Sequence, residues 1–268
     1  MSQHDPAGPG TGEGAADQLD HHGRVVLVTG GTKGIGAVLV RRFLDWGAEV
    51  MTCGRSEPES LPTARGRSAA FTVADVRDPE QAAALVDGTV ERFGRIDAVI
   101  NNAGGAPPAD AATASPRFSE SIVRLNLLAA ARRPAGQPPH ATGRRRRDRE
   151  HLVCVRDAAL ARNGRLRRGQ GRPVEPDRLA RGRVGPEGAR VAIVAGLIET
   201  EQAELHYGDE EAVARVAATV PAGRLGTPED LAQACRWLTS PLSDYMSGTA
   251  VWLHGGGERP AFLDAAGG

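Results

Sequence analysis

The 268-residue sequence predicts an α/β fold, a single-domain doubly wound parallel sheet. Three observations support this class. Short apolar runs of β-branched type alternate with longer segments of helical periodicity, and the links between them are short. The first apolar run ends at a glycine-rich turn that leads into a helical segment. Such alternation is typical of parallel strands buried between two layers of helices.

The elements in the first 105 residues follow one another regularly. The first predicted strand, 25–28, is the continuous apolar run Val-Val-Leu-Val, which fits a strand buried on both faces. A helix is predicted from about Ile35 to Trp46, because apolar side chains recur at helical spacing and Gly47 then stops it. The same alternation predicts strands at 49–53, 71–74 and 96–101 and a helix at 79–93.

The pattern fails between about residues 131 and 190. Residues 132–190 contain 17 Arg, no Lys and only 6 Asp plus Glu, and several prolines interrupt them. This composition predicts a disrupted central segment that is irregular or poorly packed and cannot form a buried strand with its covering helix. Regularity returns with a predicted strand at 191–194, helices at 210–218 and 228–238, and a closing strand at 250–253.

Bulk properties exclude several classes of function. The formal net charge of +0 argues against a dedicated nucleic-acid-binding protein, and no apolar run approaches membrane-spanning length. The three cysteines show neither metal-ligand spacing nor a disulfide framework, so we expect a cytoplasmic protein without a metal site. Residues 1–23 are predicted to be a disordered leader, 24–258 the domain and 259–268 a tail. His21 and His22 could bind a metal, but a solvated tail is the favoured interpretation.

The turn after the first predicted strand carries the first candidate site. Residues 29–36 read Thr-Gly-Gly-Thr-Lys-Gly-Ile-Gly between a strand and a helix. Glycines let the backbone approach a pyrophosphate, and a helix N-terminus offers free N–H groups and a positive dipole end. A tight turn without a ligand is the alternative for this motif taken alone. The candidate phosphate-binding residues are Gly30, Thr32, Lys33, Gly34, Ile35 and Gly36.

Several motifs, in order along the chain, resemble those of the short-chain dehydrogenase/reductase family. The turn matches the family's T-G-x-x-x-G-x-G fingerprint, and residues 101–104 match its N-N-A-G. Asp75-Val76 matches its D-V, Asn126 its active-site Asn, and residues 195–200 resemble P-G-x-I-x-T with Ala in place of Pro. On these motifs the chain is identified as a member of the family, similar to its 3-oxoacyl-carrier-protein reductases, over about residues 24–130 and 191–258.

The resemblance implies a Rossmann-type fold, hydride transfer between nicotinamide and a small-molecule carbonyl or alcohol, and a homotetramer. It assigns adenine contacts to Asp75 and Val76 and a nicotinamide contact to Thr200. Asn126 would support a water in the active site, with a helix Asn bonded to backbone as the alternative. The other cofactor-binding residues that it implies are Asn101, Ala103, Gly104, Gly196 and Ile198.

The end of the second predicted strand indicates the choice of cofactor. NAD-selective enzymes often place an Asp there to hold the ribose 2′-OH. This chain has Thr52-Cys53-Gly54-Arg55, without an acid, and both Arg55 and Lys33 could pair with a 2′-phosphate. NADP is therefore the predicted cofactor and NAD the less favoured one, with a solvated loop charge as the alternative for Arg55.

The family's acid–base pair, Tyr-x-x-x-Lys, is absent from the chain as written. Lys33 is the only lysine, and it precedes both tyrosines, Tyr207 and Tyr245. We therefore predict that the chain is catalytically inactive. We also expect its assembly to suffer, because helices from the central region form the tetramer interface in this family.

A shifted reading frame would explain the central segment. Back-translated one nucleotide later, residues 148–156 permit Ile-Val-Asn-Ile-Ser-Ser-Ala-Ser-Gly, and residues 163–171 permit Thr-Ala-Ala-Tyr-Gly-Ala-Ala-Lys. These resemble the family's catalytic segments at family spacing, and they imply one frame change near 130–132 and another near 190–192. A GC-rich gene that yields such residues in any frame is the alternative.

Two further hypotheses take the sequence as it stands. The first is a pseudoenzyme that binds a dinucleotide and acts as a sensor or scaffold. The second, least favoured, is a nucleic-acid-binding Arg-rich insert, which would lack a platform for base stacking because residues 132–190 contain no Phe, Tyr or Trp.

Overall fold

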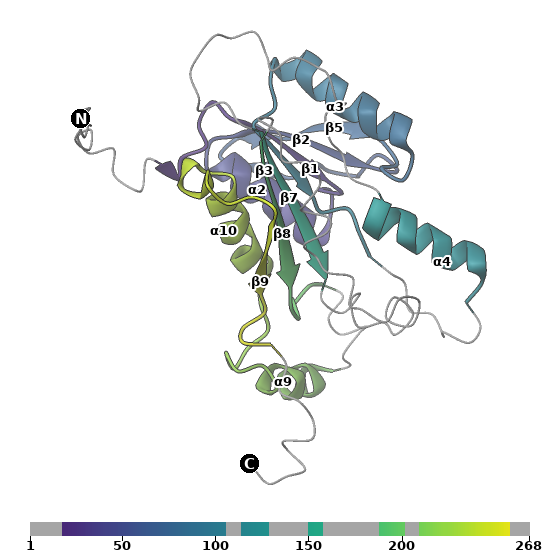
Figure 1. Ribbon diagram of the computed structural model, residues 1–268, viewed down its shortest axis with the longest axis vertical. Helices are drawn as coiled ribbons and strands as arrows, with labels where there is room; N and C mark the ends of the chain where they lie inside the picture. The colour runs from purple at the N-terminus through teal and green to yellow at the C-terminus, as the bar shows by residue number, and fades with distance from the viewer. Residues whose placement is uncertain (1–17, 106–113, 129–149, 158–187, 202–208, 258–268) are drawn as a thin grey trace, which may run out of the picture.

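Figure 1 presents the computed structural model, which describes residues 18–105, 114–128, 150–157, 188–201 and 209–257. Within these ranges the chain forms one seven-stranded sheet in the order β5-β2-β1-β6-β7-β8-β9, and every pairing in it is parallel. Its strands are β1 (Val25–Thr29), β2 (Glu49–Gly54), β5 (Ala70–Val73), β6 (Ala98–Asn101), β7 (Glu150–Asp157), β8 (Gly188–Ala195) and β9 (Thr249–Leu253).

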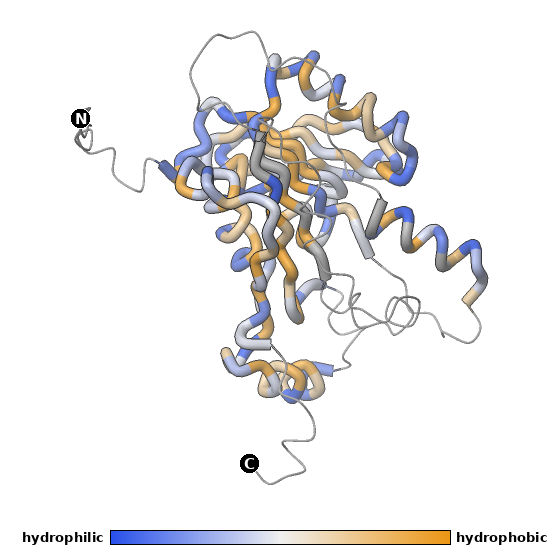
Figure 2. The backbone as a smooth tube through the Cα atoms, viewed as in Figure 1, coloured by the Kyte–Doolittle hydropathy of each residue, from blue (hydrophilic) through white to orange (hydrophobic). Residues whose placement is uncertain are grey.

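Apolar residues are concentrated in the central strands (Figure 2). All five residues of β1 and all four residues of β6 are buried. A strand buried on both faces gains from an apolar side chain at every position, which explains the continuous apolar run of β1. The strand order reverses at β1 and β6, and open sheets of this kind bind ligands at the carboxyl ends of the strands where the order reverses.

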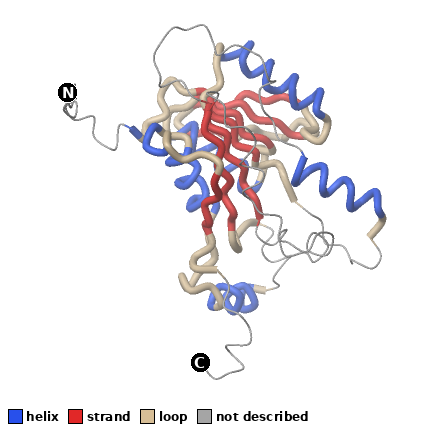
Figure 3. The backbone as a smooth tube through the Cα atoms, in the orientation of Figure 1, coloured by secondary structure: helices blue, strands red, loops and turns tan. Residues whose placement is uncertain are grey.

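Helices cover both faces of the sheet (Figure 3). α2 (Gly34–Asp45) and α10 (Pro228–Leu238) share one apolar core with residues of β1, β6, β7 and β8. α3 (Pro79–Phe93) contributes Leu85 and Val86 to a second core that includes Leu27 of β1. Two cores on opposite faces of one parallel sheet confirm the predicted doubly wound α/β fold.

The helices and strands predicted outside the central segment are confirmed. α3, α9 (Glu210–Ala218) and α10 have the predicted bounds, and the predicted strands differ only by a few residues at their ends. The short elements were not predicted, because two to eight residues carry little periodicity. These are β3 (Thr63–Ala64), β4 (Arg67–Ser68), α4 (Pro116–Val123), the short π-helix η1 (Arg124–Leu128), called the π-turn below, and the 3-10 helix η2 (Pro241–Ser243).

The prediction that residues 131–190 form no buried strand was wrong for β7. This strand pairs with β6 on one side and β8 on the other, and Val153 is 1% exposed. The cause is local: residues 152–155 are an apolar run of strand length, and the average composition of the Arg-rich segment concealed it. β8 also begins inside the segment, at Gly188. The predicted loss of the covering helix falls outside the described residues.

The packed part of the chain begins before residue 24, earlier in the sequence than predicted. His21 is fully buried rather than solvated, and its ring meets that of Phe43 edge-on with centroids 5.1 Å apart. Its Nδ1 lies 3.0 Å from the carbonyl oxygen of Leu19, and its Nε2 lies 2.9 Å from Thr239 Oγ1 at the end of α10. Burial lowers the pKa of His21 to about 4. The remaining leader, 1–17, and the tail from residue 258 lie outside the described residues.

Candidate functional site

Three glycines shape the turn between β1 and α2 in different ways. Gly30 has φ +67°, and a Cβ there would lie 3.1 Å from Ala103 Cα. A Cβ at Gly36 would lie 2.2 Å from the carbonyl oxygen of Gly30, so this glycine permits the helix to touch the turn. Gly34 has φ +53°, and no atom lies within 4 Å of the place a Cβ would take. Gly30 and Gly36 therefore serve close packing, whereas the backbone at Gly34 is open to a ligand.

The first turn of α2 has no cap. Lys33 occupies the N-cap position in an extended conformation, no side chain caps the helix, and no acidic residue lies in its first turn. In α3, α9 and α10, by contrast, Asp78, Asp209 and Thr227 supply the capping oxygen. Among the described residues, no side-chain anion therefore meets the N–H groups at the start of α2 and its positive dipole end. A phosphate is the ligand class that fits such a turn.

The loop after β6 is locked to the glycine turn. The N–H groups of Asn102 and Ala103 donate to Thr29 Oγ1 at 3.1 and 3.0 Å. Asn102 Nδ2 donates to the carbonyl oxygens of Thr29 and Gly30 at 3.1 and 3.3 Å. Thr29 is 1% exposed and Asn101, at the end of β6, is 8% exposed, so the residues from which the two loops start are buried. Asn101, Ala103 and Gly104 were predicted site residues, whereas Thr29 and Asn102 were not, although both lie inside the motifs at 29–36 and 101–104.

Asn126 lies in the π-turn η1 and binds the same loop. Its Oδ1 accepts from the N–H of Gly105 at 3.0 Å, and its Nδ2 donates to the carbonyl oxygens of Gly105 and Ile122 at 2.9 and 3.0 Å. A Cβ at Gly104 would lie 3.0 Å from Asn126 Oδ1, which explains the glycine there. The described contacts of Asn126 are therefore with backbone, and they hold the loop after β6 against η1.

The end of β2 lies beside the glycine turn. The N–H of Gly30 donates to the carbonyl oxygen of Cys53 at 3.1 Å, and a Cβ at Gly54 would lie 3.6 Å from Thr32 Cγ2. Arg55 and Lys33 are exposed, and neither forms an ion pair with another residue in the described ranges. Two such cations next to an open glycine turn fit a phosphate monoester beyond the turn.

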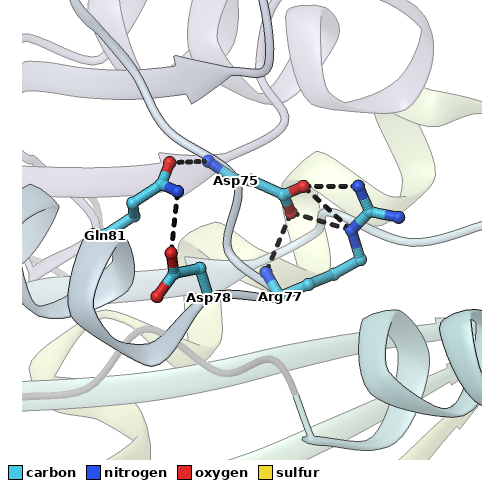
Figure 4. A network of polar contacts seen from close by, with 4 residues as sticks. All are labelled: Asp75, Arg77, Asp78 and Gln81. Atoms are coloured by element: carbon cyan, nitrogen blue, oxygen red, sulfur yellow. Dashed lines mark hydrogen bonds and ion pairs between the residues drawn. The ribbon is translucent and has the colours of Figure 1, made fainter.

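A polar network follows β5 at the same edge of the sheet (Figure 4). Arg77 donates to both carboxylate oxygens of Asp75, and the N–H of Asp75 donates to Gln81 Oε1 at 2.9 Å. Gln81 Nε2 donates in turn to Asp78 Oδ2 at 2.9 Å. The Arg77 guanidinium lowers the pKa of Asp75 below its usual value. Val76 is 7% exposed and belongs to the core against α3, so the two members of the motif point to different surroundings.

The C-terminal half places its motif after β8, at the same edge. A Cβ at Gly196 would lie 2.7 Å from His254 Cβ, so this glycine lets β8 pass close to the segment after β9. Ile198 forms a parallel bridge with Gly226, and the N–H of Glu199 donates to the Gly226 carbonyl oxygen at 2.8 Å. Thr200 follows and is half-buried.

No tyrosine–lysine pair is brought together in the described chain. Lys33 stands in the glycine turn, and Tyr207 lies outside the described residues. Tyr245 is fully exposed and precedes β9, so it lies toward the amino edge of the parallel sheet, opposite the glycine turn.

Comparison with known proteins accounts for this arrangement. The sequence profile of the short chain dehydrogenases matches residues 24–133, and a profile described as enoyl-(acyl carrier protein) reductase matches residues 178–258. L-fucose dehydrogenase of Oryctolagus cuniculus is 33% identical over 252 residues, which cover 88% of this chain and 85% of that protein. This chain belongs to the short-chain dehydrogenase family. It is therefore a member of a family of oxidoreductases that act on small molecules.

Other relatives of this family member differ in substrate and cofactor. The 3beta-hydroxysteroid dehydrogenase 1 of Eggerthella lenta is 32% identical over 256 residues, covering 88% of this chain and 94% of that protein. A gluconate 5-dehydrogenase from Burkholderia cenocepacia, in complex with NADP and tartrate, has a TM-score of 0.70 and 25% identity over 91% of this chain and 98% of its own. A 3-ketoacyl-(acyl-carrier-protein) reductase from Brucella melitensis, complexed with NADH, shares the fold with a TM-score of 0.65 and 24% identity over 88% and 98%.

Two further properties of the described ranges bear on the site. None of the helices there is both long and apolar enough to span a membrane. Nor do three or more His, Cys, Asp or Glu residues of these ranges gather where they could hold a metal ion.

Proposed function

We propose that this chain is an NADP-binding oxidoreductase of its family, built for hydride transfer between nicotinamide and a carbonyl or alcohol, whose turnover is impaired in the sequence as written. The observation that carries the proposal is the uncapped glycine turn, locked to the loop after β6 and flanked by the cations Lys33 and Arg55. These features fit a dinucleotide phosphate.

The proposed roles follow the positions of the residues. The N–H groups of Gly34 and Ile35 hold the pyrophosphate, while Lys33 and Arg55 hold the 2′-phosphate. Asp75 offers its carboxylate and Val76 its backbone to the adenine, and the loop of Asn101, Ala103 and Gly104 lies along the dinucleotide. The segment with Gly196, Ile198 and Thr200 holds the nicotinamide end. Once bound, the cofactor supplies the hydride chemistry, and the chain supplies orientation.

Impairment follows from the residues that a proton transfer needs. A positioned acid–base group contributes about 10²–10⁴-fold to rate. With the sole Lys ahead of both Tyr, the chain has no Tyr-x-x-x-Lys, and Asn126 alone remains of the family's catalytic residues. Residues 134–177 separate the two profile matches, which favours a central segment translated in a shifted frame. The genomic DNA across codons 125–195 tests this directly.

The missing pair also favours a second candidate, a pseudoenzyme that binds the dinucleotide and acts as a sensor or scaffold. An uninterrupted reading frame in the DNA would support it over the shifted frame. Under either candidate we propose a cytoplasmic protein whose family-type homotetramer is weakened, because the central segment would supply part of that assembly.

Cofactor selectivity tests the proposal. Fluorescence titration with NADPH and NADH compares the chain with Lys33→Met and Arg55→Met. Each variant should bind NADPH about tenfold more weakly, because a charge-assisted contact to phosphate is lost, with little change for NADH. Arg41→Met, which removes an exposed cation from the middle of α2, is the matched control. Equal losses for NADPH and NADH, or tighter binding of NADH by the unmodified chain, would refute the NADP assignment.

A further inference from the structure

Two arginine–aspartate forks of the same design stand at opposite edges of the sheet. Arg77 binds Asp75 and Arg95 binds Asp97, each pair two residues apart, with the guanidinium reaching both carboxylate oxygens. The Asp97 carboxylate has an internal task, because its Oδ2 also accepts from the N–H of Val25 at 2.8 Å and its side chain is only 11% exposed. Asp75 lies at the carboxyl edge, and its side chain is 27% exposed.

The Asp75 fork lines a hollow that opens to solvent. Asp78 and Gln81 border it from the start of α3, Ser121 from α4 and Arg124 from η1. Arg124 is held by Glu120 on its own side of the hollow, with Nη2 and Oε1 2.9 Å apart. The hollow is thus lined by the Asp75 carboxylate, which the Arg77 guanidinium holds in one orientation.

The carboxylate retains room for a donor from outside. A carboxylate offers about four acceptor positions. Three N–H groups of Arg77 fill three of them: the backbone N–H and Nε–H at Oδ1, and an Nη2–H at Oδ2, which Nε also reaches. About one acceptor position remains, which suits a single N–H donor.

The loop that carries the fork is held on both sides. The backbone N–H of Asp75 donates to Gln81, which is tied to Asp78, and the N–H of Asp78 donates to the Asp75 carbonyl oxygen at 3.0 Å. Asp78 also caps α3 by accepting from the N–H of Glu80 at 2.9 Å. The backbone of Asp75 therefore keeps its place when the Arg77 guanidinium is removed, and the guanidinium, together with the backbone N–H of Arg77 at Oδ1, sets the direction of the carboxylate.

We propose that Arg77 is a positioning residue for nucleotide recognition: it turns the Asp75 carboxylate so that its remaining acceptor position meets the exocyclic amine of a purine base in the hollow. This inference rests on the proposed function, which brings a dinucleotide to this edge. Arg77 also keeps the pKa of Asp75 below its usual value, so the carboxylate stays an acceptor under mildly acidic conditions.

The test compares NADPH with its hypoxanthine analogue, which has a carbonyl in place of the adenine amine and an N–H in place of the neighbouring ring nitrogen N1. The unmodified chain should prefer NADPH, because the analogue presents an acceptor to a fixed carboxylate. Arg77→Met should weaken NADPH binding between about twofold and tenfold, the cost of ordering a freed side chain on binding. It should leave the analogue unchanged or slightly better bound, so the preference between the two ligands falls.

Arg95→Met is the matched control, because it removes the equivalent fork at the amino edge and should leave both affinities unchanged. Arg77→Lys keeps the charge without the planar fork, so its preference should lie between those of Arg77→Met and the unmodified chain. Circular dichroism verifies that each variant is folded. An unchanged preference in folded Arg77→Met, or tighter NADPH binding by it, overturns the inference. If the unmodified chain binds neither ligand, the proposed function itself fails.

Discussion

The region up to Gly105 and the central region from 131 to 190 differ in what their functions require. In the first, the proposed nucleotide site is built from backbone: an uncapped helix start, glycines that allow close contact, and a loop held by Thr29 and Asn102. In the second, the family resemblance expects the acid–base pair Tyr-x-x-x-Lys, and residues 131–190 contain neither Tyr nor Lys. The central region still supplies β7 to the sheet, because a strand needs only a short apolar run. Under the proposed function, loss of side-chain identity would remove proton transfer while the fold and the sites built from backbone stay in place.

The largest expected effect would come from restoring the family's catalytic side chains to the central region. We predict that a chain whose codons between about 131 and 190 are read in the shifted frame gains NADPH-dependent reduction of a carbonyl. The gain should reach at least about 10²-fold over the chain as written, the lower range for an acid–base group. NADPH absorbance against ketones and 3-ketoacyl thioesters measures it. Equal rates for both chains would mean that the catalytic segment lies elsewhere.

Damage to the glycine turn should weaken cofactor binding itself. Gly36→Ala places a Cβ 2.2 Å from the Gly30 carbonyl oxygen, so the turn must shift. We expect NADPH affinity to fall by at least about tenfold and stability by about 1–3 kcal/mol, as for other overpacked sites. Gly88→Ala in α3, where the Cβ meets nothing within 4 Å, should stabilise the helix by about 0.5–1 kcal/mol and leave affinity unchanged. Calorimetry and fluorescence titration decide; a Gly36→Ala variant with normal affinity would show that the turn does not hold the phosphates.

An acidic side chain at Gly54, at the end of β2, should change the cofactor preference. A Cβ at Gly54 meets Ser56 and Phe71 atoms at 3.4 and 3.6 Å, which is ordinary contact, so Gly54→Asp should fold. The new carboxylate would stand where NAD-selective enzymes hold the ribose 2′-OH, and it would repel a 2′-phosphate. We predict that NADPH binding weakens about tenfold while NADH binding is kept or improved. A parallel loss for both cofactors would place the 2′ position elsewhere.

The smallest predicted effect concerns stability rather than the candidate site, and it depends on the buried His21. The folded-state pKa of about 4 lies below the ordinary 6.5, so the unfolded chain binds more protons between these values. Stability from neutral His21 is therefore complete above pH 6.5 and is lost as the pH falls toward 4. Relative to His21→Gln, the chain should lose about 2 kcal/mol between pH 7 and pH 5. Urea unfolding at both pH values measures this; equal losses in the two chains would contradict the burial of a neutral imidazole.

Much of the fold could be predicted because each central strand is a continuous apolar run and each long helix has clear periodicity and a stop signal. β7 was not predicted because its apolar run, residues 152–155, has little effect on the average composition of residues 132–190. His21 escaped because its burial depends on Phe43 and Thr239, which are distant in sequence. At the site, the glycine turn was predictable from spacing, whereas the Arg77 fork was not, since an Asp and an Arg two residues apart are common on solvated loops. The tie between Asn126 and Gly105 requires the π-turn, for which the sequence gives no period.

The most direct test of the central claim is a titration of the chain as written with NADPH, followed in the same sample by a panel of ketones and 3-ketoacyl thioesters. We predict saturable NADPH binding that is tighter than NADH binding, and no oxidation of NADPH above the background of the buffer. Absence of saturation up to about 1 mM NADPH, the upper end of the usual range for enzyme ligands, would contradict the nucleotide site. Steady oxidation of NADPH would contradict the claim that this sequence has lost proton transfer.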